Sequence, residues 1–221
     1  MKNTKEKSLS TQGKVDLVYD TIKERIITTY YAPGEILSEN IIAEEFKVSR
    51  TPVREAMKRL QQNHWLIMLQ NVGMQVPTFD INHFKDLFST KEALESLALK
   101  QAIDNIKNED INTLHEYLDE LKTAEPGNLD VLIKIDNKIH KKISEIANNS
   151  ILEIYLSDIY ERLLRTWLHV EKQGVGINKD LLYKTMAAIV KSLENRDKAA
   201  AERVEHEHME YHRNEIRAGL F

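Results

Sequence analysis

The stretch Ser49–Leu60, SRTPVREAMKRL, constrains the fold of this chain more than any other. Ser49 is a good helix N-cap residue, and Pro52 falls in the first helical turn, where its missing N–H costs nothing. Apolar residues recur at helical spacing, at Val53, Ala56, Met57 and Leu60. Basic residues occupy the other faces, at Arg50, Arg54, Lys58 and Arg59. The pattern predicts a helix with one buried face and one strongly positive face.

A shorter helix is predicted directly before this basic helix. Ser38 can cap the segment SENIIAEEF. Three apolar residues of the segment are expected to face inward, namely Ile41, Ile42 and Phe46. Lys47–Val48 then leave room only for a tight turn. Two helices joined by such a turn, with a basic second member, predict a helix-turn-helix; ordinary packing of two amphipathic helices is the alternative.

The first turn of the basic helix has the features of a helix that reads DNA. It offers short polar and positive side chains, at Ser49, Arg50, Thr51 and Arg54. The helix N-terminus itself favours phosphate, and polar side chains there can reach base edges in the major groove. The chain as a whole has a net charge of −4, but DNA binding needs a local basic patch rather than a basic average.

The segment LSENIIAEEFKVSRTPVREAMKRLQQNHWL resembles the winged helix-turn-helix of the GntR family of bacterial transcription regulators, and VSRTPVREA is close to that family's most recognisable string. The helical remainder resembles the FadR-type branch of that family, whose C-terminal domain is called FCD. The resemblance covers residues 14–217, and it is strongest in the first third of the chain.

A small hairpin, the wing, is expected after the basic helix. WLIML and MQV are short apolar runs on either side of residues 70–73, which have turn character. Asn71 and Gly73 would then contact the DNA backbone or minor groove, or else lie in an exposed turn with no role in binding. The family usually has glycine at the position of His64, so the turn before Trp65 is expected to differ slightly.

The length, the composition and the start of the chain limit the class of protein to which it can belong. It has 221 residues, 42% hydrophobic content and no cysteine, so disulfide and thiolate chemistry are excluded. No apolar run is long enough for a membrane span. The start of the chain has charge but no apolar stretch behind it, so we expect a disordered tail at residues 1–13 instead of a signal peptide, and a cytoplasmic protein.

The expected organisation is mostly α-helical, in two domains. Residues 14–77 are predicted to form the winged helix-turn-helix, in which Leu17–Thr28 is the first helix. Residues 78–221 are predicted to form an all-α bundle of about six helices, for effector binding and dimerisation. Asp80, Asn108 or Asp110, Asn128, Ser150, Asn178 and Asp197 are the expected helix starts.

A metal site in the bundle is a hypothesis. Asp136 and His140 are four residues apart on one helical face, and His208 lies in an apolar stripe of the last helix, from which His206 and His212 fall off. The resemblance implies a divalent metal, Zn, Ni or Mn, bound through Asp136, His140 and His208. Met186 replaces the histidine that the family usually supplies as fourth ligand, and a thioether is a poor ligand for these ions. The alternative is a structural ion pair beside an unrelated histidine.

The resemblance also implies a small-molecule effector. The family usually has an arginine at the position of Lys91, which often binds a ligand carboxylate; lysine keeps the charge but loses the bidentate geometry. Arg162 and Arg165 are expected to line the same cavity, or else to be ordinary surface charge.

The sequence therefore predicts a ligand-responsive transcription regulator and no enzyme. It would bind a palindromic double-stranded DNA operator as a homodimer, with no membrane association, as a repressor or an activator. A constitutive DNA-binding dimer without effector is one alternative. A helical metal-dependent hydrolase using Asp136, His140 and His208 is another, but no nucleophile or general base is placed by motif.

Overall fold

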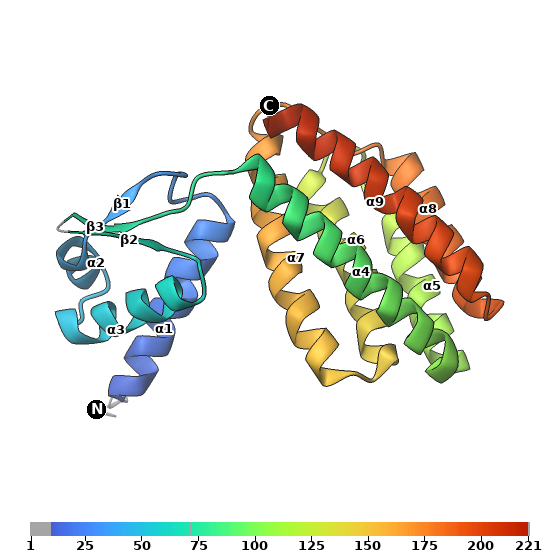
Figure 1. Ribbon diagram of the computed structural model, residues 1–221, viewed down its shortest axis with the longest axis horizontal. Helices are drawn as coiled ribbons and strands as arrows, with labels where there is room; N and C mark the ends of the chain where they lie inside the picture. Colours follow the sequence, from blue (N-terminus) through green and yellow to red (C-terminus); the bar gives the residue numbers. More distant parts are fainter. Residues whose placement is uncertain (1–9, 71, 221) are drawn as a thin grey trace, which may run out of the picture. The chain divides into compact units, whose positions relative to one another are not determined.

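The computed structural model describes residues 10–70 and 72–220, and their side chains up to residue 217. It divides into two compact units, the first ending at Thr78 and the second starting at Phe79 (Figure 1). Each unit has its own hydrophobic core.

The first unit is a helix-turn-helix with a small antiparallel sheet. Its helices are α1 (Thr11–Ile27), α2 (Glu39–Glu45) and α3 (Arg50–Gln62), and its strands are β1 (Ile36–Leu37), β2 (Ile67–Leu69) and β3 (Gly73–Gln75). The strand order is β1-β3-β2, so the predicted hairpin β2–β3 gains a third strand from the segment before α2. That two-residue strand was not predicted, because it is too short to show an alternating pattern.

Two expectations for the first unit were wrong in detail. Helix α1 begins at Thr11, before the predicted start at Leu17 and inside the predicted tail, because the Ser10 hydroxyl accepts a hydrogen bond from the Gly13 N–H at 3.1 Å. Residues 1–9 lie outside the described part of the chain. Ile41 does not face inward: it is 66% exposed, because α2 is too short to bury more than one narrow face.

Two residues with positive φ lie at or near the wing: Gly73 at the start of β3, and His64 in the turn before β2. Gly73 has φ +143°, and a Cβ at this position would lie 3.2 Å from the Leu37 carbonyl oxygen, so β1 packs closely only against glycine. His64 has φ +58°, a left-handed conformation that ends α3 and that glycine adopts at lower cost.

The second unit is an all-α bundle, which confirms the predicted fold class. Its helices are α4 (Ile81–Asn105), α5 (Asn108–Thr123), α6 (Leu129–Ala147), α7 (Ser150–Glu171), α8 (Lys179–Glu194) and α9 (Lys198–Leu220). Helix α4 packs against α6, α7 and α9 (Figure 1). Side-chain caps at Asp80, Asn128 and Asn178 form as predicted, whereas Asn149, and not Ser150, caps α7. The N-cap residue of α5 is Lys107 instead of Asn108 or Asp110. Among the described residues, no helix is both long and apolar enough to cross a bilayer.

Candidate DNA interface and candidate metal centre

Helix α3 presents the side chains that were expected to read DNA. Val53, Ala56, Met57 and Leu60 are fully buried in the core of the first unit. The predicted contact residues of the first turn, in contrast, are all exposed: Ser49, Arg50, Thr51 and Arg54. Ser49 occupies the N-cap position without a side-chain capping bond, so its hydroxyl is not committed to the helix.

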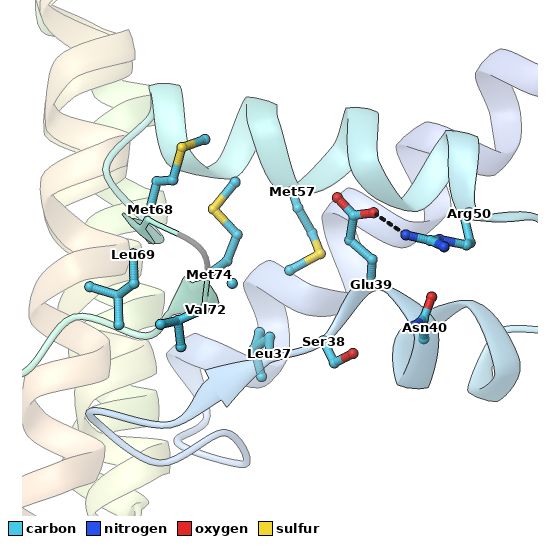
Figure 2. A pocket seen from close by; sticks show the side chains of 11 residues that line it. Leu37, Ser38, Glu39, Asn40, Arg50, Met57, Met68, Leu69, Val72 and Met74 are labelled. Atoms are coloured by element: carbon cyan, nitrogen blue, oxygen red, sulfur yellow. Dashed lines mark ion pairs between the residues drawn. The ribbon is translucent and has the colours of Figure 1, made fainter.

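A glutamate of the neighbouring helix orients the two arginines. Arg54 donates hydrogen bonds through Nε and Nη2 to the Glu39 carboxylate, at 3.1 and 2.9 Å. The Arg50 Nη2 atom lies 3.5 Å from the same carboxylate. The dashed line in Figure 2 marks this ion pair. The hydrogen bond from Arg54 lowers the pKa of Glu39. Because both guanidinium groups remain more than half exposed and share one carboxylate, the surface keeps a net positive charge.

A shallow groove of ≈ 300 Å³ joins this turn to the wing. Glu39 and Arg50 are among its polar lining residues, and three methionines, Met57, Met68 and Met74, are among its apolar ones (Figure 2). Gly73 is one of the lining residues, next to Val72, whose side chain is 60% exposed at the wing tip. Asn71, the other predicted wing contact, lies outside the described residues.

The second unit brings the three predicted metal ligands together. The His140 Nε2 atom lies 3.2 Å from the His208 Nε2 atom, and the Asp136 Oδ1 atom lies 3.7 and 3.6 Å from these two nitrogens. All three residues are at least 94% buried. Ligand atoms around a zinc ion at ~2.0–2.2 Å lie roughly 3–3.5 Å apart, so the donor set fits a divalent metal.

The outer nitrogens of both imidazoles have polar neighbours. The His140 Nδ1 atom lies 3.0 Å from Oε1 of Glu95. The His208 Nδ1 atom lies 3.3 Å from the Thr185 hydroxyl, which itself donates to the Leu181 carbonyl. These contacts favour the tautomers with a proton on Nδ1, which leaves two Nε2 lone pairs facing each other. Such a pair needs a proton or a metal ion between the rings.

The three predicted ligands lie in a cluster of buried polar groups, which consists of Lys91, Glu95, Asp136, His140, Glu205, His208 and His212. Burial controls protonation in this cluster. Burial and the neighbouring Glu95 raise the pKa of Glu205 well above its ordinary value, which favours the neutral acid. Burial also lowers the pKa of His208 and of His212 well below the ordinary histidine value. Neutral imidazoles are the form that binds metals.

Each of the three residues expected to bind an effector contacts a different group of the bundle. Lys91 is 4% exposed, and its ammonium group donates to Glu95 at 2.6 Å. Arg162 donates to Asp158, and the Arg165 guanidinium lies 4.5 Å from the centre of the Phe79 ring. Burial, followed by Arg162, lowers the pKa of Arg165 to about 10.

A small cavity lies beside the cluster. Its volume is ≈ 10 Å³, space for about one water molecule. Lys91, Asp136, Trp167 and His212 are among the residues around it, whereas Arg162 and Arg165 are not among its described lining residues. A ligand larger than a water molecule does not fit this cavity as it stands.

Sequence reasoning missed three members of the cluster, which are Glu95, Glu205 and His212. The assignment of His212 to the outside of the apolar stripe was wrong, since its side chain is 3% exposed. Its spacing of four residues from His208 was the available signal, because residues four apart share a helical face. In the same way, Glu95 stands four residues after Lys91, so these two residues share a helical face. His206, in contrast, is exposed, as expected.

Comparison with known proteins assigns both units. Residues 14–76 match the model of the bacterial regulatory proteins of the gntR family, and residues 86–211 match the FCD domain. The chain therefore belongs to the gntR family of transcription regulators and carries a DNA-binding helix-turn-helix and an FCD effector-binding domain, as in the FadR-type branch.

Relatives and a solved structure agree with this assignment. An uncharacterized HTH-type transcriptional regulator, YdhC, of Bacillus subtilis is 27% identical over 64% of each chain. The Nta operon transcriptional regulator of Aminobacter aminovorans is 29% identical over 73% of this chain and 78% of its own length. The structure of Escherichia coli McbR/YncC has the same fold, with a TM-score of 0.73, 23% identity and coverage of 92% of this chain and 95% of that one. These families are transcription regulators, so the hydrolase alternative is set aside.

Proposed function

We propose that this protein is a homodimeric regulator that binds a palindromic operator and whose DNA affinity depends on a ligand in the FCD domain. The observation that supports it most is the exposed first turn of α3, where Arg50 and Arg54 are oriented by Glu39. Arginine held in a fixed direction suits contacts to guanine, and Ser49 and Thr51 beside it suit contacts to phosphate. Asn71 and Gly73 would add contacts at the wing.

Within the FCD domain we propose a divalent metal, Zn, Ni or Mn, held by Asp136, His140 and His208. The mutual distances of 3.2–3.7 Å between their donor atoms support this proposal. The metal would supply a fixed positive charge in a buried site, where it could attract an anionic effector.

The effector would be a small metabolite, and a carboxylate is the class that Lys91 suits. Because Lys91 already binds Glu95, a carboxylate would have to compete with Glu95 and enlarge the cavity of ≈ 10 Å³. The small cavity also favours the second candidate, a constitutive dimer without effector. A ligand selective for the folded protein raises its melting temperature, so a thermal-shift screen of small acids, with and without Zn²⁺, separates the two candidates.

The test of the proposed function is a mobility-shift titration. The probe is a duplex that the wild-type protein selects from a random pool, which should contain an inverted repeat. Chelation of metal, followed by addition of Zn²⁺, should change the protein concentration at the midpoint of the titration severalfold. The reason is that the coupling free energy between two sites is typically ~1–3 kcal/mol. A selected DNA sequence without two-fold symmetry would contradict the palindromic operator. A midpoint that no metal or acid changes would contradict the dependence of DNA affinity on a ligand.

We expect a homodimer in solution, with contacts made by the bundle. Three large apolar side chains stand exposed within one stretch of α7: Ile151, Ile154 and Tyr155, each at least 60% exposed. Leu97, on the adjacent helix α4, is 41% exposed. Ile154→Glu should give a monomer in sedimentation velocity, because a charge would be buried in the interface. Ile41→Glu, which changes an equally exposed isoleucine of the first unit, should remain a dimer. A wild-type monomer at micromolar concentration, with and without DNA, would rule out this arrangement.

We expect Met186→His to tighten Zn²⁺ or Ni²⁺ binding. The variant restores the histidine that the family usually has, on the helix whose Thr185 already contacts His208. An added ligand that contributes ~1.4 kcal/mol gives a tenfold change in affinity. Competition with a chromophoric chelator measures it on both proteins. Equal affinities would show that position 186 does not reach the metal.

A further inference from the structure

His212 is a buried histidine whose ring nitrogens make no hydrogen bond within the described part of the structure. It lies on α9, one turn after His208, and the two ring centres are 4.3 Å apart. Its side chain is 3% exposed. A polar group buried without a partner is costly, so a native structure that keeps one usually gives it something to bind.

The surroundings of His212 hold its ring in place without using its nitrogens. Trp167 of α7 meets the ring edge-on, with centres 5.2 Å apart and planes at 81°. Tyr211 adds a tilted ring contact at 5.3 Å. Aromatic packing of this kind orients an imidazole, while both nitrogens stay available to a ligand.

A second unsatisfied group faces this histidine. The Asp136 Oδ1 atom is buried and has no hydrogen-bond partner among the described residues. Asp136, His208 and His212 each offer one atom, and these atoms all lie within 4.8 Å of one another. A carboxyl group and imidazoles whose polar atoms converge in a buried interior match the donor set of a transition-metal site.

We propose that His212 is a fourth metal ligand beside Asp136, His140 and His208, which leaves position 186 free to add a further one. This inference rests on the proposed metal site and extends it. The four donors would be Asp136 and His140 of α6 with His208 and His212 of α9, two pairs that each stand four residues apart on one helical face. Three imidazole nitrogens and one carboxylate oxygen favour Zn²⁺, Ni²⁺ or Co²⁺ over Mg²⁺ and Ca²⁺.

The experiment compares the Zn²⁺ affinity of the full-length wild type with that of two variants, by competition with a chromophoric chelator. His212→Gln removes the proposed ligand, and we expect its affinity to fall by about tenfold or more. His206→Gln is the matched control on the same helix, since its side chain is 61% exposed and contacts Glu92 instead of the cluster. We expect it to bind as the wild type does. Circular dichroism and the melting temperature of the metal-free proteins check that each variant folds.

X-ray absorption of the Zn²⁺-loaded wild type needs no variant, and should count three imidazoles. Two imidazoles, or equal affinities of His212→Gln and the wild type, would overturn the role of His212 while the three-ligand site stands. No Zn²⁺ binding by the wild type would overturn both. Met186→His in the His212→Gln background should recover affinity, which a purely structural role of His212 does not predict.

Discussion

Lys91→Met is expected to destabilise the bundle by ~3–5 kcal/mol, the usual cost of removing one partner of a buried ion pair. The pair with Glu95 is almost fully buried, with side chains 6% and 3% exposed. Burial by itself lowers the pKa of Lys91, but Glu95, Glu205 and Asp136 raise it above its ordinary value, so the ammonium group stays charged. Burial likewise raises the pKa of Glu95, yet His140 and Lys91 hold it well below its ordinary value. Methionine fills a similar volume, so the loss reports mainly the missing charge.

Urea unfolding followed by circular dichroism measures the change, and hydrogen exchange assigns it to the unit after Thr78. The matched control is Lys134→Met, because Lys134 and Asp130 form a pair of the same spacing with side chains 60% and 43% exposed. We expect this control to change stability by less than ~1 kcal/mol. Glu95→Gln in the Lys91→Met background should recover much of the loss, since no buried charge of the pair is left unpaired. A Lys91→Met variant as stable as the control would mean that Glu95 is neutral in the folded protein.

Arg54→Ala is expected to abolish specific DNA binding and leave the fold intact. The Arg54 side chain is 53% exposed and outside the buried face of α3, so the core of the first unit should keep its packing. A charged contact to guanine or phosphate is worth ~1–3 kcal/mol, or about five- to 150-fold in affinity. The loss also leaves Glu39 without its main partner and facing the DNA, which adds repulsion.

Mobility-shift titrations at fixed salt, with specific and scrambled duplexes, measure this effect. Arg59→Ala is the control on the same helix: Arg59 donates to Asp16 at 2.7 Å and stacks on the Tyr19 ring, so it serves contacts with α1. The control should keep most of the specific affinity. If Arg54→Ala binds the selected duplex as tightly as the wild type, α3 is not the recognition helix.

Much of the architecture could be predicted because it depends on neighbours in the sequence. Asp80, Asn128 and Asn178 cap the helices that they were expected to cap, since a side-chain oxygen needs only the N–H groups two or three residues ahead. The buried face of α3 was predicted from its spacing of apolar residues. Two of the errors were also local in origin: Ser10 starts α1 early, and Asn149 takes the cap expected of Ser150.

The sequence by itself determined the helix-turn-helix, its exposed arginines, the helical bundle and the positions of Asp136, His140 and His208 on inward faces. Only the tertiary structure decided how these side chains converge and how Lys91, Glu95 and His212 join them, since the residues come from α4, α6 and α9. The physical reason is that helix formation depends on contacts within one turn, whereas the depth and rotation of a helix depend on what it packs against. His212 is buried because Trp167 of α7 covers its ring, and no pattern within α9 contains that contact.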